Sequence, residues 1–143
     1  MKIIHKSEIW KGHFTYLDGY DEDMYRSVEF TVEINIEDSV FTGYSWDEES
    51  RSSFNSPAKI KGFFDGDTVS FVMSYPCLYY KNENGQIELD KSKKHPEIHY
   101  YGRLSQDGKK ISGEWEMTEY ISETIDGLIE SFSTGSFMIE KQS

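Results

Sequence analysis

The most constraining feature of this sequence is an alternation of apolar and polar side chains with a period of two residues. In residues 111–117 the odd positions are Ile, Gly, Trp and Met, and the even positions are Ser, Glu and Glu. Residues 28–37 alternate even more regularly, with five apolar side chains separated by polar ones. This period is typical of a β-strand that has one buried face and one solvated face.

The same alternation predicts six more strands, and short turn sequences separate several of them. These strands span residues 10–16, 40–46, 60–64, 68–75, 100–104 and 135–141. Asp38-Ser39, Asp65-Gly66 and Asp107-Gly108 are typical of tight turns between antiparallel strands. The hairpins around the two Asp-Gly turns resemble each other, either through duplication or because hairpins of similar geometry converge on similar residues.

Four stretches lack this clear alternation. Residues 1–9 are predicted to be an N-terminal lead-in segment, and residues 47–57 and 81–97 are predicted to be polar loops. Residues 120–134 fit either a helix with one apolar stripe or a pair of strands that turns at Asp126-Gly127. The Ser and Thr content and the glycine weaken a helix, so strands are favoured.

Eight consecutive strands without a crossover helix predict a β-sandwich or a β-barrel. Glycines recur at similar depth in several of the strands, namely Gly43, Gly62, Gly102 and Gly113. Glycine permits the sharp coiling that closes a sheet, so this recurrence favours a barrel. We therefore predict an all-β fold, an antiparallel up-and-down barrel of about eight strands, in which residues 1–143 form a single domain.

This arrangement resembles the calycin-like up-and-down barrels, the group that includes lipocalins, fatty-acid-binding proteins and avidins. The resemblance extends over most of residues 10–141 and lies in the pattern of strands. Trp10-Lys11-Gly12 reverses the Gly-x-Trp order that opens lipocalins, and Gly113-Glu114-Trp115 has that order near the other end of the chain. The resemblance implies a lipocalin-like barrel, and it implies no particular ligand.

The charge of the chain restricts its partners. Asp and Glu total 26 against 15 Lys and Arg, which gives a formal net charge of −11. Such a chain repels phosphate backbones, so no nucleic-acid partner is expected. This charge has two interpretations. It attracts a basic protein partner, or it serves solubility alone.

The location of the chain is predicted from what its sequence lacks. No apolar run approaches the roughly 18 residues of a membrane span, and the N-terminus carries no apolar core of a signal peptide. The single cysteine, Cys77, allows no intramolecular disulfide and is expected to be a small buried apolar residue. A cytoplasmic location is the expectation.

No constellation of residues predicts catalysis, a metal site or a cofactor. His95 and His99 have the spacing of zinc ligands on a helix, but Pro96 and the strand that follows disfavour a helix there. The acidic pairs lie in predicted loops, where they lack the burial that tunes a general acid. The chain is therefore expected not to be an enzyme.

The interior of the barrel is the predicted functional region. Aromatic residues make up 15% of the chain, and an eight-stranded barrel either fills with side chains or holds one small ligand. The leading prediction is non-enzymatic binding of a small, mostly apolar molecule. The alternative is an acidic interaction or inhibitor module, with a filled core, that captures a basic protein. The sequence does not predict the oligomeric state. The candidate ligand-binding residues are Trp10, Tyr16, Phe71, Tyr75, Tyr100 and Trp115.

Overall fold

The computed structural model describes residues 5–16, 27–48, 56–81, 83–84, 86–92, 96–124 and 127–142. These residues form ten strands: β1 (His5–Tyr16), β2 (Ser27–Glu37), β3 (Val40–Asp47), β4 (Ala58–Asp65), β5 (Thr68–Ser74), β6 (Leu78–Lys81), β7 (Ile87–Asp90), β8 (Ile98–Leu104), β9 (Lys110–Thr124) and β10 (Gly127–Lys141). The described part of the chain contains no helix of the length and apolarity that a bilayer crossing requires.

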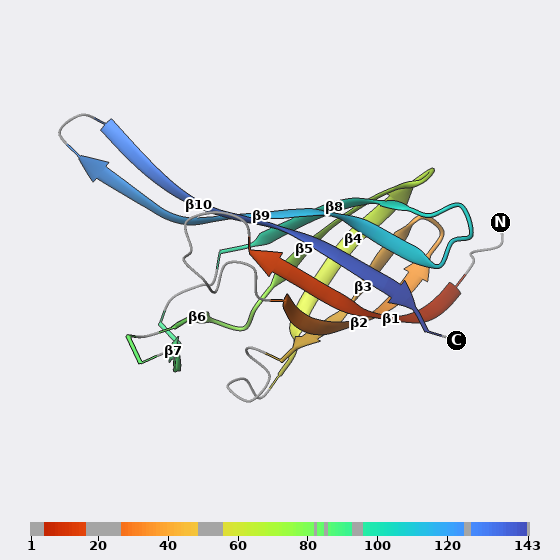
Figure 1. Cartoon of the computed structure of the whole chain (residues 1–143), viewed down its shortest axis with the longest axis horizontal. Coiled ribbons are helices and arrows are strands. Elements are labelled where there is room, and N and C mark those ends of the chain that lie inside the picture. Colours follow the sequence, from red (N-terminus) through yellow and green to blue (C-terminus); the bar gives the residue numbers. More distant parts are fainter. Residues whose placement is uncertain are drawn as a thin grey trace.

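Eight of the strands form a closed barrel in the order β1-β10-β9-β8-β5-β4-β3-β2, and every neighbouring pair is antiparallel (Figure 1). β6 and β7 form a separate two-stranded sheet, which lies along the chain in the connection from β5 to β8. The predicted all-β up-and-down barrel is therefore confirmed. The prediction that residues 81–97 form only a loop is wrong, because β7 lies within that range.

Glycines allow the barrel to close, as the sequence predicted. A side chain on Gly135 would collide with the Thr15 carbonyl oxygen and the Trp115 indole. A side chain on Gly113 would collide with the backbone of Tyr101 and Gly102 on β8. Gly135 lies opposite Trp115 in the pairing of β9 with β10, so a small residue makes room for a large one across the strands.

The two ends of the barrel differ in their connections. At one end, which we call the turn end, short turns join β2 to β3, β4 to β5 and β8 to β9. Asp38, Gly66 and Gly108 adopt positive φ values of 61°, 63° and 73° in these turns. At the other end, which we call the loop end, β3 finishes at Asp47 and β4 starts at Ala58. The loop end also carries the β6–β7 sheet (Figure 1).

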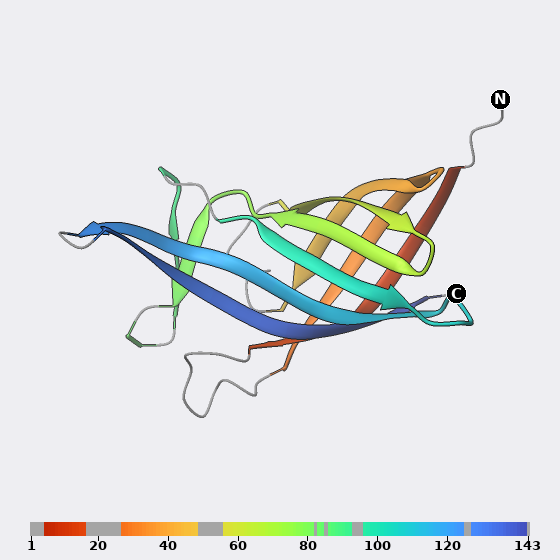
Figure 2. The same ribbon diagram turned by 90° about the horizontal axis from the view of Figure 1, so that it is seen from above.

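β9 and β10 continue past the loop end as a two-stranded arm (Figure 2). Pairing of β9 with β8 stops at Met117, and pairing of β10 with β1 starts at Gly135. Beyond these residues the two strands pair only with each other in the described chain, up to Thr124 and Gly127. The strand interpretation of residues 120–134 is therefore confirmed, with residues 125 and 126 outside the described ranges.

The prediction of a lead-in segment over residues 1–9 is wrong for its second half, because β1 begins at His5 and pairs with β2 from there. The local pattern hid this strand. Ile9 points outward and is 44% exposed, whereas Glu8 lies on the same strand face as the buried Trp10. An apolar residue outside and a charged one inside reverse the expected alternation. Residues 1–4 lie outside the described ranges.

The core lies inside the barrel and is rich in aromatic rings. Phe71 stacks on Tyr100 with ring centroids 4.7 Å apart and an interplanar angle of 6°. Phe137 meets Tyr100 edge to face at 5.1 Å. These geometries are the favourable ones for aromatic pairs. Further buried members come from all eight barrel strands, as the alternation predicted, and Cys77 is also buried.

Candidate functional site

The inward face of β3 changes character along the strand. Its first inward residues, Phe41 and Gly43, belong to the apolar part of the barrel, and the next two are Ser45 and Asp47. Ser45 is 2% exposed and Asp47 is 3% exposed. Within the described ranges they are the buried residues outside the hydrophobic set. The loop end of the barrel therefore has polar groups inside its wall.

Asp47 is hydrogen-bonded to Tyr75, which follows the last residue of β5. The Tyr75 hydroxyl donates a hydrogen bond to Asp47 Oδ2, and both side chains are buried. Asp47 is also the cross-strand partner of Phe30 on β2. The carboxyl group thus accepts from a buried phenol, and its residue pairs across the strands with a buried phenylalanine.

Tyr100 adds a second phenol to this region. Burial, and then the negative charge of Asp47, raise the pKa of the Tyr100 hydroxyl far above its usual range. The hydroxyl therefore stays protonated at any physiological pH and remains able to donate a hydrogen bond. The Tyr100 ring packs against Phe30 at a centroid distance of 6.1 Å, which places both rings in one layer of the core.

Ser45 has an unsatisfied hydroxyl group. Its Oγ is buried and has no hydrogen-bond partner within the described part of the chain. Its cross-strand neighbours are Val32 on β2 and Ala58 on β4, which offer no polar side-chain atoms. A buried hydroxyl without a partner costs about 1–3 kcal/mol. Buried polar groups in proteins are normally hydrogen-bonded to protein atoms or to ordered water.

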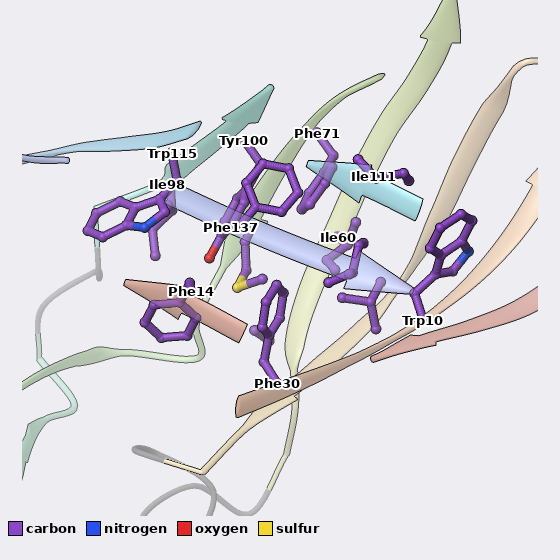
Figure 3. Packing of buried hydrophobic residues seen from close by; sticks show 14 of the residues in the cluster. Trp10, Phe14, Phe30, Ile60, Phe71, Ile98, Tyr100, Ile111, Trp115 and Phe137 are labelled. Atoms are coloured by element: carbon purple, nitrogen blue, oxygen red, sulfur yellow. The ribbon is translucent and has the colours of Figure 1, made fainter. Parts of the chain in front are cut away.

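The aromatic rings of the core include Phe14, Phe30 and Trp115 (Figure 3). Phe14 meets Phe30 edge to face at 5.4 Å and meets Trp115 at 6.3 Å. The Trp115 indole N–H donates to the Thr15 carbonyl oxygen at 2.9 Å, which ties β9 to β1 across β10. The Trp115 ring is thereby fixed in orientation.

The structure brings most of the predicted site residues together. Tyr75 and Tyr100 lie near Asp47, and Phe71 stacks on Tyr100. Trp115 belongs to the same aromatic group, whereas Trp10 lies at the opposite end of the cluster (Figure 3). There its indole N–H donates to Glu8 at 3.2 Å. The Tyr16 side chain lies outside the described atoms, and ligand binding by any of the six residues stays a prediction.

Sequence reasoning missed Ser45 and Asp47. The prediction ended this strand at residue 46 and assigned Asp47 to a polar loop, but β3 includes Asp47. One signal was present, because residues 45 and 47 have the same phase as the inward residues 41 and 43. The rule that inward positions are apolar concealed them.

The chemistry that this cluster offers is hydrogen bonding. It combines one carboxyl group, two phenols and one hydroxyl within an aromatic surround. No group of three or more metal-ligating side chains gathers among the residues that the structure describes. His99 is exposed, and His95 lies outside the described ranges.

The fold class that the structure defines is a closed barrel of eight antiparallel strands. No protein-family model matches the chain, and no curated protein matches it in sequence. Among solved structures, the rhizavidin–biotin complex is similar, with a TM-score of 0.51 and 14% sequence identity, over 96% of this chain and 93% of that one. The apo form of shwanavidin has 19% identity and a TM-score of 0.48, over 92% of this chain and 94% of that one. The rhizavidin match shows an avidin-like barrel fold for this chain.

Proposed function

We propose that this protein is a non-enzymatic binder of a small, mostly apolar molecule at the loop end of its barrel. In this proposal Ser45, Asp47, Tyr75 and Tyr100 supply polar contacts, and the aromatic rings beside them hold the apolar body. The observation that carries the proposal is the buried Ser45 hydroxyl without a partner, next to a buried carboxyl group on the same strand face.

A filled structural core gives no reason for these two residues. Alanine or valine at position 45 would pack against Val32 and Ala58 without an unsatisfied hydroxyl. A binding site gives a reason, because proteins often tolerate a stability cost where a group serves function. The rhizavidin structure, which has a similar fold, is a complex with biotin, so a protein with this kind of fold binds a small molecule.

The second candidate is an acidic module that captures a basic protein, with a filled barrel. One observation favours it, because Glu29, Glu33 and Glu37 all lie exposed along the outer face of β2. A row of like charges on one strand is suited to a basic partner. This candidate leaves the buried polar pair on β3 without a role, so we rank it second.

The test is a titration of the protein with a neutral, environment-sensitive apolar dye, together with native mass spectrometry of freshly purified protein. Saturable dye binding is expected, and Ser45→Ala should weaken it by about 0.5–1.5 kcal/mol, the net value of one neutral hydrogen bond. The same variant should melt at an equal or higher temperature, because it removes an unsatisfied buried group.

The matched control is Thr42→Ala, which lies on the same strand but faces outward. It should leave dye binding unchanged. If the wild type shows no saturable dye binding and no co-purified small molecule, the proposed function is wrong. Recovery of a basic protein by the same material would then favour the acidic module.

A further inference from the structure

We infer that the molecule held at the loop end is an organic cation, an ammonium compound that directs its charged nitrogen to Asp47 and its apolar body to the aromatic rings. This inference rests on the proposed function and names the class of ligand. It requires that the site holds a negative charge, that its surroundings favour positive charge, and that the approach to the site does so as well.

Asp47 supplies the negative charge that a cation needs. Its side chain is buried, and Oδ2 accepts a hydrogen bond from the Tyr75 hydroxyl. The Ser45 hydroxyl lies two residues away on the same strand face, and it is a further acceptor without a partner in the described chain. Ammonium groups carry up to three N–H donors, so a cation bound at Asp47 keeps donors for further acceptors.

The rings around Asp47 also favour positive charge. Phe30 is the cross-strand partner of Asp47, and Tyr100 is close enough for the carboxylate charge to shift its pKa. Aromatic faces carry partial negative charge and attract cations within about 6 Å of the ring centroid. A carboxylate next to aromatic rings is thus suited to a cation with an apolar body, and it opposes an anionic guest.

The electrostatic field of the protein acts in the same direction. The net charge is −11, and Glu48 is exposed immediately after Asp47 at the loop end. Its carboxylate accepts from the Glu29 backbone N–H at 3.2 Å, which holds a second negative charge near this end. Such a field draws cations to the site and slows the approach of anions.

The experiment compares three probes that share a phenyl ring and a short alkyl chain but differ in charge. They are 2-phenylethylammonium, 2-phenylethanol and 3-phenylpropanoate, each titrated calorimetrically at neutral pH and constant ionic strength. The cation should bind at least about tenfold more tightly than the alcohol, because hydrogen bonds to charged groups contribute about 1.5–3 kcal/mol. The anion should bind more weakly than the alcohol.

Asp47→Asn keeps the size of the side chain and removes its charge. It should reduce the preference for the cation over the alcohol to about threefold or less. Glu33→Gln, which removes one exposed outward charge from β2, should leave that preference unchanged within about twofold. If Asp47→Asn does not fold, as judged by circular dichroism, the ratios measured on the wild type decide alone.

The outcomes separate this inference from the proposed function. Equal or tighter binding of the alcohol or the anion by the wild type overturns the cation assignment and leaves small-molecule binding intact. A cation preference that persists in folded Asp47→Asn also overturns it. Absence of binding by all three probes and by the apolar dye contradicts both proposals.

Discussion

The turn end and the loop end of this barrel are made by the same eight strands, yet the buried polar groups at the two ends differ in their hydrogen-bond partners. At the turn end, the chain itself supplies the partners of a buried carboxylate, that of Glu8. At the loop end, the Ser45 hydroxyl has no partner among the described residues, and Asp47 lies beside it. In the function that we propose, the polar groups at the turn end serve stability, whereas those at the loop end serve binding.

The Glu8 carboxylate has ion-pair and hydrogen-bond partners from the chain itself. Its side chain is 7% exposed, and Lys141 Nζ lies 2.8 Å from its Oε2, with Lys6 Nζ at 3.7 Å. The Trp10 indole N–H donates to its Oε1. Burial alone would raise the pKa of Glu8, but the hydrogen bonds from Lys141 and Trp10 and the two lysine charges outweigh burial and lower it.

The largest expected effect comes from truncating the two tryptophans that lie at opposite ends of the core. Trp10→Ala and Trp115→Ala should each lower the free energy of unfolding by about 3–5 kcal/mol, because each removes a buried indole. Of the two, Trp115→Ala should also weaken dye binding, since its ring belongs to the loop-end aromatic group. Urea unfolding and dye titration of both variants make the comparison. If both variants weakened dye binding equally, the two ends would not differ in function.

A smaller effect is expected from Tyr75→Phe. This change removes the hydroxyl that donates to Asp47 and leaves a buried carboxyl group with one donor fewer. The free energy of unfolding should fall by about 1.5–3 kcal/mol, the usual value for a hydrogen bond to a charged group. Chemical denaturation measures it, with Tyr44→Phe on the exposed outer face of β3 as the control. A loss as small as that of the control would mean that Asp47 does not depend on Tyr75.

The smallest effect is a pH dependence that belongs to the turn end. The pKa of Glu8 lies below its ordinary value of 4.5, so ionised Glu8 favours the folded state. Its contribution is present above the unfolded pKa and is lost as the pH falls through the lower folded value. Glu8→Gln should therefore be less stable than the wild type near neutral pH, and the difference should shrink in acid.

Urea midpoints of both proteins across this pH range provide the measurement, and dye binding near neutral pH should not change. A stability difference that stays constant from neutral to acidic pH would contradict this account of Glu8.

The sequence was sufficient to predict the barrel, because alternation and glycine placement are local signals of a coiled antiparallel sheet. Gly113 and Trp115 show this, since both lie where the alternation puts them. Residues 120–134 remained ambiguous because their apolar spacing fits two periods, and only the pairing of β9 with β10 decides between them. Pairing over such distances is a property of the folded chain.

The polar part of the site could not be predicted because it departs from the rule that made the fold predictable. Asp47 borders a polar, serine-rich stretch, so the local sequence indicates a loop. Its hydrogen-bond donor Tyr75 is 28 residues away along the chain. Glu8 escaped prediction for the same reason, since its partner Lys141 lies at the other end of the sequence.

The most direct test of the account is an amide NMR titration of isotope-labelled wild-type protein with the neutral apolar dye. Shift changes that saturate with probe concentration and concentrate on the loop-end residues Phe30, Ser45, Asp47 and Tyr100 are the predicted result. Residues of the turn end, such as Glu8, Trp10 and Ile139, should not respond. Saturable changes concentrated at the turn end or on the outer face of the barrel, or no saturable change at all, would contradict the central claim that the loop end is the binding site.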